Sequence, residues 1–228
     1  MQASIQSIFT WSQNRIFAGG SPEIVLLVEW RGLSPADKQG KQSRKVVARE
    51  IELRIWLEPN VELVNVLGCK AEEEEGNSLL LRLGKIHSGQ RRFAGLEFKI
   101  SPMPAGRHNV LWLQWQYKQP PIERIRELPV QKLNLEYTHH TSVLRDSCNS
   151  HVEKHMALLE TEELLKRAVA MRAAGQQMPA YEMICRHADK LLLLATRTGD
   201  LLMLKEAESL YKYNELELSP HDKAAGEM

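Results

Sequence analysis

The chain has 228 residues, of which 43% are hydrophobic, so it can bury one large core or two small ones. Thirty basic and twenty-nine acidic residues give a net charge of +1, which lacks the basic excess that nucleic-acid binding requires. Neither a secretory signal nor an apolar stretch long enough to cross a membrane stands out. We therefore expect a cytoplasmic protein with no nucleic-acid partner and no membrane insertion.

The cysteine pattern supports this expectation. Cys69, Cys148 and Cys185 are three in number and widely spaced, and no C-x-x-C pair occurs. Disulfide frameworks and zinc ribbons both need paired cysteines, so neither is predicted. The three residues are interpreted as free thiols in a reducing compartment.

Short apolar runs and alternating patterns occupy the chain from Glu23 to Tyr137, as is typical of β-strands. In the stretch REIELRIWL, one face carries Ile51, Leu53, Ile55 and Leu57, while the other carries Glu50, Glu52, Arg54 and Trp56. One buried face and one solvated face indicate an antiparallel sheet.

A second alternating strand, VLWLQWQY, leaves its two faces open to interpretation. Leu111, Leu113, Trp115 and Tyr117 alternate with Trp112, Gln114 and Gln116, so Trp112 interrupts an otherwise polar face. Burial of the strand on both sides is one explanation. Trp56 and Trp112 both lie on polar faces, and tryptophan is enriched in interface hot spots. They are our candidates for partner binding; alternatively, the chain's own helices cover both rings, with Met156, Leu159 and Leu165 as neighbours.

Turn residues separate about seven such strands, and no helical pattern lies between them, which predicts a β-sandwich over residues 1–138. Two charged segments are interpreted as solvated loops: the basic stretch from Lys38 to Lys45 and the acidic run from Glu72 to Glu75. Four consecutive carboxylates lack the alternating ligand spacing of a calcium loop.

The hydrophobic period becomes helical at Ser150, which stands three residues before Glu153, the spacing of a capping box. A helix from there should end near Ala174, because Gly175 favours a left-handed turn and Pro179 cannot continue the helix. A second helix over residues 180–198 ends at Gly199, and Asp200 can cap a third. The predicted class is α+β: an antiparallel β-sandwich, a linker over 139–150, a small antiparallel three-helix bundle over 151–218 and a frayed tail over 219–228.

The linker region is rich in possible metal ligands. His151 and His155 are four residues apart on the predicted helix and share a face, and His139, His140, Asp146 and Cys148 are near in sequence. A zinc-protease motif would place glutamate directly after the first histidine, where this chain has Val152. A polar connection is therefore preferred; a metal-dependent hydrolase or metal-regulated protein built on His139, His140, His151 and His155 is the alternative.

Other catalytic patterns are missing from the sequence. No G-x-S-x-G elbow and no phosphate-binding glycine loop occurs, and the cysteines have no recognisable catalytic context. We expect a protein that is not an enzyme and binds no cofactor.

A family resemblance rests on turn motifs and on the helical end of the chain. The stretches LEPNVELVNVLGCK, LRLGKIHSGQRRFAGLEFKI and LWLQWQYKQPPIERIRELPVQKLNLEYT resemble the C-terminal, β-rich accessory region that follows the von Willebrand factor type A domain in many bacterial proteins. The matching positions are a Val66-Leu67-Gly68 turn, a turn with Gly84, Ile86, Ser88 and Gly89, a strand from Leu96 to Ile100, and Tyr117. The helices after Glu163, with their glycine turn and "G-D" start, are similar as well.

One departure limits what the resemblance implies. A von Willebrand type A domain binds its metal through an Asp-x-Ser-x-Ser loop in a doubly wound parallel sheet. The nearest string here, DSCNS at 146–150, has Cys148 in place of the first serine and follows no parallel unit. The resemblance therefore implies the accessory region without the von Willebrand domain itself, and an interaction or assembly role with a protein partner or neighbouring domain. Oligomeric state is left open.

Overall fold

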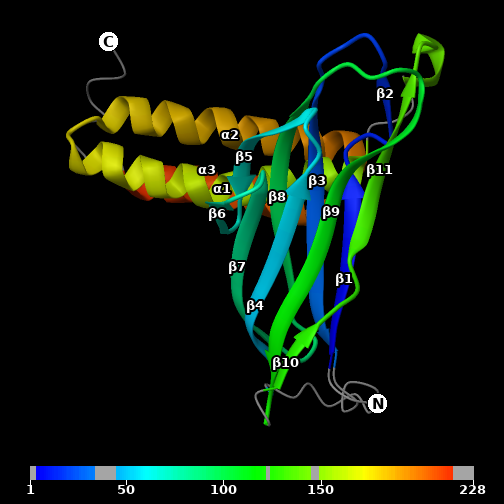
Figure 1. The fold of residues 1–228 in the computed structure, drawn as a ribbon. Helices are drawn as coiled ribbons and strands as arrows, with labels where there is room; N and C mark the ends of the chain where they lie inside the picture. The colour runs from blue at the N-terminus through cyan, green and yellow to red at the C-terminus, as the bar shows by residue number, and fades with distance from the viewer. Residues whose placement is uncertain (1–3, 34–44, 122–123, 145–148, 218–228) are drawn as a thin grey trace. The chain divides into compact units, whose positions relative to one another are not determined.

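The structure is a computed structural model that describes residues 4–33, 45–121, 124–144 and 149–217. The chain divides into two compact units, Met1–Val152 and Glu153–Met228, each described by itself below. Two sheets of mostly antiparallel strands are followed by three helices (Figure 1), so the predicted α+β class is confirmed.

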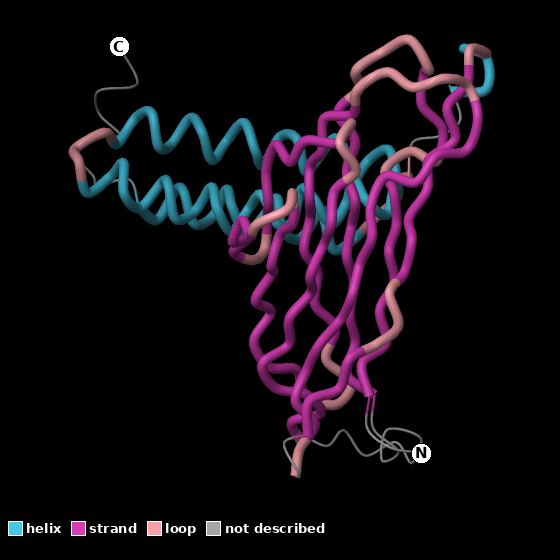
Figure 2. The backbone as a smooth tube through the Cα atoms, in the orientation of Figure 1, coloured by secondary structure: helices cyan, strands magenta, loops and turns pink. Residues whose placement is uncertain are grey.

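The first unit is a sandwich of two sheets (Figure 2). The smaller sheet contains, in spatial order, β1 (Ser4–Trp11), β3 (Glu23–Leu33), β8 (Arg91–Ile100) and β5 (Val61–Leu67). The larger contains β2 (Arg15–Phe17), β11 (Gln131–Thr138), β9 (Gly106–Gln119), β4 (Val46–Leu57), β7 (Ser78–His87) and β6 (Lys70–Glu74), with β10 (Arg124–Glu127) beside β9. All described pairs are antiparallel except that of β11 with β2.

The core of this unit lies between the two sheets. On β4, Ile51, Leu53 and Ile55 are fully buried within it, as the alternation predicts. The strand with ambiguous faces, β9, resolves the same way, because Leu111, Leu113, Trp115 and Tyr117 all lie in the core cluster. Trp112 is partly buried and belongs to the opposite face.

The predicted number of about seven strands is wrong, because the described residues form eleven. The missed ones are β1, β2, β6 and β10. The polar residues of β1 hide its period, but eight residues in register with β3 hold it in the sheet. The supposed acidic loop forms most of β6, where Glu72 pairs with Arg82 and Glu74 pairs with Arg54, both at 3.0 Å. Residues 38–44 of the basic loop lie outside the described residues.

The second unit contains most of α1 (Ser150–Ala173), together with α2 (Gln177–Thr198) and α3 (Leu201–Glu217). Side chains of all three helices meet in one core, which includes Ala157, Ala168, Ile184, Leu191 and Leu210. Polar contacts give the helix directions: Lys154 near the start of α1 pairs with Asp200 before α3, and Arg172 near its end donates to Asn214 near the end of α3. The helices are therefore arranged up, down and up.

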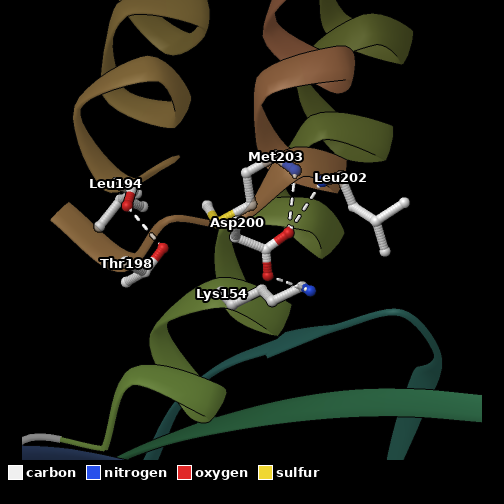
Figure 3. A network of polar contacts seen from close by, with 6 residues as sticks. All are labelled: Lys154, Leu194, Thr198, Asp200, Leu202 and Met203. Atoms are coloured by element: carbon white, nitrogen blue, oxygen red, sulfur yellow. Dashed lines mark hydrogen bonds and ion pairs between the residues drawn. The ribbon is translucent and has the colours of Figure 1, made fainter. Parts of the chain in front are cut away.

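The turns between the helices agree largely with the sequence. Gly175 and Gly199 both have left-handed backbone angles, with φ of 79° and 69°. Asp200 caps α3, since its Oδ1 accepts hydrogen bonds from the N–H groups of Leu202 at 2.9 Å and Met203 at 3.3 Å (Figure 3). Pro179, however, lies in the first turn of α2 and does not end a helix; proline is tolerated there because first-turn N–H groups have no intrahelical partner.

Helix α1 begins at Ser150, as predicted, but the predicted capping box is wrong. Asn149 supplies the capping oxygen, because its Oδ1 accepts a hydrogen bond from the His151 N–H at 3.0 Å. Glu153 does not close the box and instead pairs with Arg197 of α2. A tertiary ion pair has therefore replaced the local interaction that the spacing suggested.

The predicted linker is not a separate segment in the part of the chain that the structure describes. Residues 139–144 and 149–150 belong to the first unit, and Thr141–Leu144 form a 3₁₀-helix, η2, that packs against β2. The unit boundary lies between Val152 and Glu153. The tail from residue 218 lies outside the described residues. No helix in the described ranges has the length and apolar character needed to cross a bilayer.

Candidate protein-contact face

Trp56 and Trp112 lie directly opposite each other on the neighbouring strands β4 and β9. In the same row across the larger sheet, Ser78 of β7 is opposite Trp56, and Lys132 of β11 is opposite Trp112. Directly paired residues have Cβ atoms about 5 Å apart, so these side chains are immediate neighbours. The sheet thus gathers the two candidate tryptophans, 56 positions apart in sequence, at one place on its outer face.

Two polar partners hold the indole of Trp112. Its Nε1–H donates a hydrogen bond to Glu58 Oε1 at 2.8 Å. The ammonium of Lys132 lies 4.1 Å from the ring centroid, which is cation–π geometry. We call Trp56, Trp112, Glu58 and Lys132 the tryptophan face. The indole has a fixed orientation, so a partner that contacts it need not order a mobile side chain.

The charges at this face are balanced. Glu58 and Lys132 contribute one charge of each sign on either side of Trp112. Two residues before Trp56, Arg54 donates to Glu74 of β6 at 3.0 Å. An apolar aromatic centre with a rim of both signs suits a protein surface, whereas a polyanion would need an excess of positive charge.

Glu58 and Lys132 were not predicted as site residues. Glu58 follows β4 and is distant in sequence from Trp112, and Lys132 reaches the ring through the register of β11 against β9. That register shifts at Leu133/Asn134, an irregularity that strand periodicity does not reveal. No signal in the sequence identifies these two residues.

The structure gives the four candidate metal-binding histidines different surroundings. The ring of His139 meets Phe17 edge-on at 6.3 Å, and the backbone N–H of His140 donates to Thr138 Oγ1. His151 lies beside Phe93 and 3.6 Å from Glu29, while His155 belongs to the second unit. Among the residues described, no three or more His, Cys, Asp or Glu side chains are placed to hold a metal ion. Asp146 and Cys148 lie outside those residues.

The two described cysteines are free thiols in structural surroundings. Burial raises the pKa of Cys69 to about 11, so its thiol stays protonated at neutral pH and is a poor nucleophile. Cys185 lies among the helices, where its Sγ accepts a hydrogen bond from Asn214 Nδ2 at 3.3 Å.

Comparison with known proteins finds no matching family and no matching curated protein, but it does find solved structures. A von Willebrand factor type A protein from Catenulispora acidiphila superposes with a TM-score of 0.51 at 16% identity, over 71% of this chain and 39% of that one. The ArnB paralog VWA2 from Sulfolobus acidocaldarius superposes with a TM-score of 0.53 at 10% identity, over 91% of this chain and 93% of that one.

These similarities establish a fold related to that of von Willebrand factor type A proteins. Identities this low show the fold alone. The chain spans about two fifths of the length of the Catenulispora protein. The major pilin BcpA of Bacillus cereus is also similar, but its TM-score of 0.42 is too low to establish a shared fold.

Proposed function

We propose that this chain is a non-enzymatic protein-interaction or assembly module, and that the tryptophan face is its contact surface. It corresponds to the accessory region of von Willebrand factor type A proteins, without the von Willebrand domain itself, and acts in the cytoplasm. The partner is a folded protein or a neighbouring domain. The observation that carries the proposal is the direct pairing of Trp56 with Trp112 outside the core cluster.

The energetic argument rests on the cost of an aromatic residue on an outer face. Trp56 and Trp112 are both partly buried, so each keeps part of its ring area exposed, and the area that a partner removes from water contributes roughly 25 cal/mol per Å². Tryptophan is among the residues most enriched in binding hot spots, and paired anchors near the centre of a patch contribute most. The polar rim of Glu58 and Lys132 fits the usual anatomy of such a patch.

The non-enzymatic part of the proposal is supported by what the reactive groups do. Cys69 is partly buried with its pKa raised, and Cys185 Sγ accepts a hydrogen bond from Asn214. His151 lies between a carboxylate and an aromatic ring. Titration calorimetry with zinc tests the metal-binding alternative. Stoichiometric binding that a His151→Ala/His155→Ala double variant loses would establish that alternative.

The contact surface can be tested by capture from an extract of the native host with the full chain. We compare the wild type, the Trp56→Ala/Trp112→Ala double variant and Phe17→Ala, a matched control that removes a partly exposed aromatic ring from β2 of the same sheet. A partner retained by the wild type and the control should be lost by the double variant. With that partner purified, loss of a hot spot should weaken Kd by about 30-fold or more. Equal affinity for wild type and double variant would refute the tryptophan face.

A further inference from the structure

Most outer strands of the two sheets carry a feature that discourages pairing with a further strand. Strand β6 presents Glu72, Glu73 and Glu74, and β10 is four residues long with three charges. Strand β2 has only three residues. Strand β5 carries Glu62 and an irregular register between Leu63 and Asn65. Short length, charge and bulges are the usual means by which proteins protect sheet edges.

Strand β1 has none of these features. Its sequence, SIQSIFTW, contains no charged residue and no proline, and all eight residues pair with β3 without a register shift. Among the described strands, β1 pairs with β3 alone. The side chain of Ile8, at the centre of the strand, is 46% exposed. A long, regular, uncharged edge of this kind is a ready template for another strand.

The phase of the β1–β3 ladder shows which backbone groups face outward. The Ser12 N–H donates to Val25 O at 2.8 Å, one position beyond the pair Trp11 and Leu26. Hydrogen-bonded and non-bonded pairs alternate along an antiparallel ladder. Counting back from Ser12, the backbone groups of Thr10, Ile8, Gln6 and Ser4 therefore bond to β3. The backbone N–H and C=O groups of the remaining residues point away from β3: these are Ile5, Ser7, Phe9 and Trp11.

We propose that β1 pairs with β1 of a second copy of this chain, antiparallel about a two-fold axis at Ile8. In this register Ile5 is opposite Trp11 of the second copy and Ser7 is opposite Phe9, so all four outward residues form hydrogen-bonded pairs. Ile8 lies opposite Ile8 of the second copy, on the face away from the core. The two four-stranded sheets become one continuous sheet across the dimer.

The composition of β1 favours a second copy as the occupant. A two-fold interface is self-complementary, so the strand meets its own residues, and like charges directly opposite each other are destabilising. Strand β1 has no charge to repel itself, and pairing removes the exposed Ile8 side chain of both copies from water. The edge belongs to the smaller sheet and the tryptophan face to the larger, so this inference does not depend on the proposed function.

Sedimentation of the purified full chain tests the dimer. Ile8→Lys places two ammonium groups opposite each other at the axis and should weaken dimerisation at least about tenfold. Val64→Lys is the matched control, because Val64 is 50% exposed on β5, at the other edge of the same sheet. We expect a concentration-dependent dimer for the wild type and Val64→Lys, and a monomer for Ile8→Lys. A wild type that stays monomeric up to about 100 μM, or equal dimerisation of the two lysine variants, would overturn the proposal.

Two further variants report on the register. In the proposed pairing the two Ile8 Cα atoms lie about 4.5 Å apart, within disulfide range, so Ile8→Cys should cross-link on mild oxidation and Val64→Cys should not. Mass spectrometry must show the link between the two residue-8 peptides. Ser7→Pro removes an outward N–H without affecting the β3 ladder and should also yield a monomer, with an unchanged tryptophan fluorescence spectrum confirming that the sandwich is folded. A cross-link at position 64 alone, or a fully dimeric Ser7→Pro, contradicts this register.

Discussion

The sandwich and the helical unit build their cores from different side chains. The sandwich core contains large residues such as Trp30, Phe98 and Trp115, and the indole N–H groups of both tryptophans have no hydrogen-bond partner in the described part of the chain. In the helical unit, six of the eleven buried residues of the core cluster are alanines, and three polar residues of the unit are also buried: Thr161, His187 and Asn214.

This difference indicates what each unit depends on. Alanine contributes little apolar area, so the helical unit relies more on specific hydrogen bonds for its stability. Asn214 connects three elements: its Nδ2 donates to the Tyr181 carbonyl at 2.9 Å and to Cys185, and its Oδ1 accepts from Arg172 of α1 at 2.8 Å. The stability of the sandwich depends instead on close packing of its core. An apolar side chain of the wrong size there leaves a cavity or a clash.

Two spectroscopic signals separate the units in solution. All five tryptophans lie within the first unit, so tryptophan fluorescence reports on the sandwich. The three helices lie almost wholly in the second unit, so circular dichroism at 222 nm reports mainly on the helical unit.

The largest expected effect is on the sandwich core. Phe98 is fully buried and meets Trp11 edge-on at 6.2 Å. Phe98→Ala should lower the free energy of unfolding of the sandwich by about 3–5 kcal/mol, because it removes buried area and leaves a cavity. Urea denaturation followed by tryptophan fluorescence measures the change. A loss below about 1 kcal/mol would mean that neighbouring side chains fill the cavity, and that the sandwich depends less on close packing than its core of large side chains suggests.

The second effect should appear in the helical unit alone. Asn214→Ala removes the partner of the Arg172 guanidinium and of the Tyr181 carbonyl at a buried position. We expect a loss of about 1–3 kcal/mol in the transition followed at 222 nm. Ser209→Ala, an exposed position on the same helix, is the control and should change little. An equal loss of stability for both variants would contradict the expectation that the hydrogen bonds of Asn214 stabilise the helical unit.

A smaller effect distinguishes the two possible caps of α1. Asn149→Ala removes the oxygen that accepts the His151 N–H and should cost about 0.5–2 kcal/mol, whereas Ser150→Ala should cost almost nothing. Paired urea titrations of the two variants measure both values. The reverse order would restore the serine cap that the sequence spacing suggested.

The smallest effect is a pH dependence confined to the helical unit. Burial lowers the pKa of His187, opposed by Glu160 and assisted by Lys190, while Thr161 Oγ1 lies 2.8 Å from Nε2. The folded state therefore favours the neutral ring. Its contribution to stability is complete above the ordinary value of 6.5 and is lost as pH falls from there toward the lowered pKa of the folded state.

Denaturation midpoints at 222 nm, measured between pH 7.5 and 5, test this sign. The midpoint of the wild type should fall as pH decreases. His187→Gln should show a flatter profile, because glutamine at position 187 does not titrate in this pH range. Parallel profiles for the two proteins would show that another group causes the dependence.

The central strands and the helices could be predicted because their signals are local. On β4 the alternation of apolar and polar residues survives intact, and on α1 and α2 the glycine turns mark where the helices end. Strands β1 and β6 were missed because sheet pairing, and not their own period, makes them strands. The capping box failed for a related reason, since Glu153 finds a partner in Arg197, 44 positions away.

Part of the candidate site was likewise visible in the sequence, and part depends on tertiary contacts. Trp56 and Trp112 were identified from sequence, because a tryptophan among polar residues of an alternating strand is visible without any structure. Glu58 and Lys132 were not identified, since their contact with the Trp112 indole depends on the chain that follows β4 and on the pairing of β11 with β9. Periodicity therefore determined which face each side chain occupies and where the helices lie. Which strands are neighbours, and so which tryptophan meets which charge and which edge stays open, was decided only by the tertiary structure, because strand pairing joins residues that no local pattern connects.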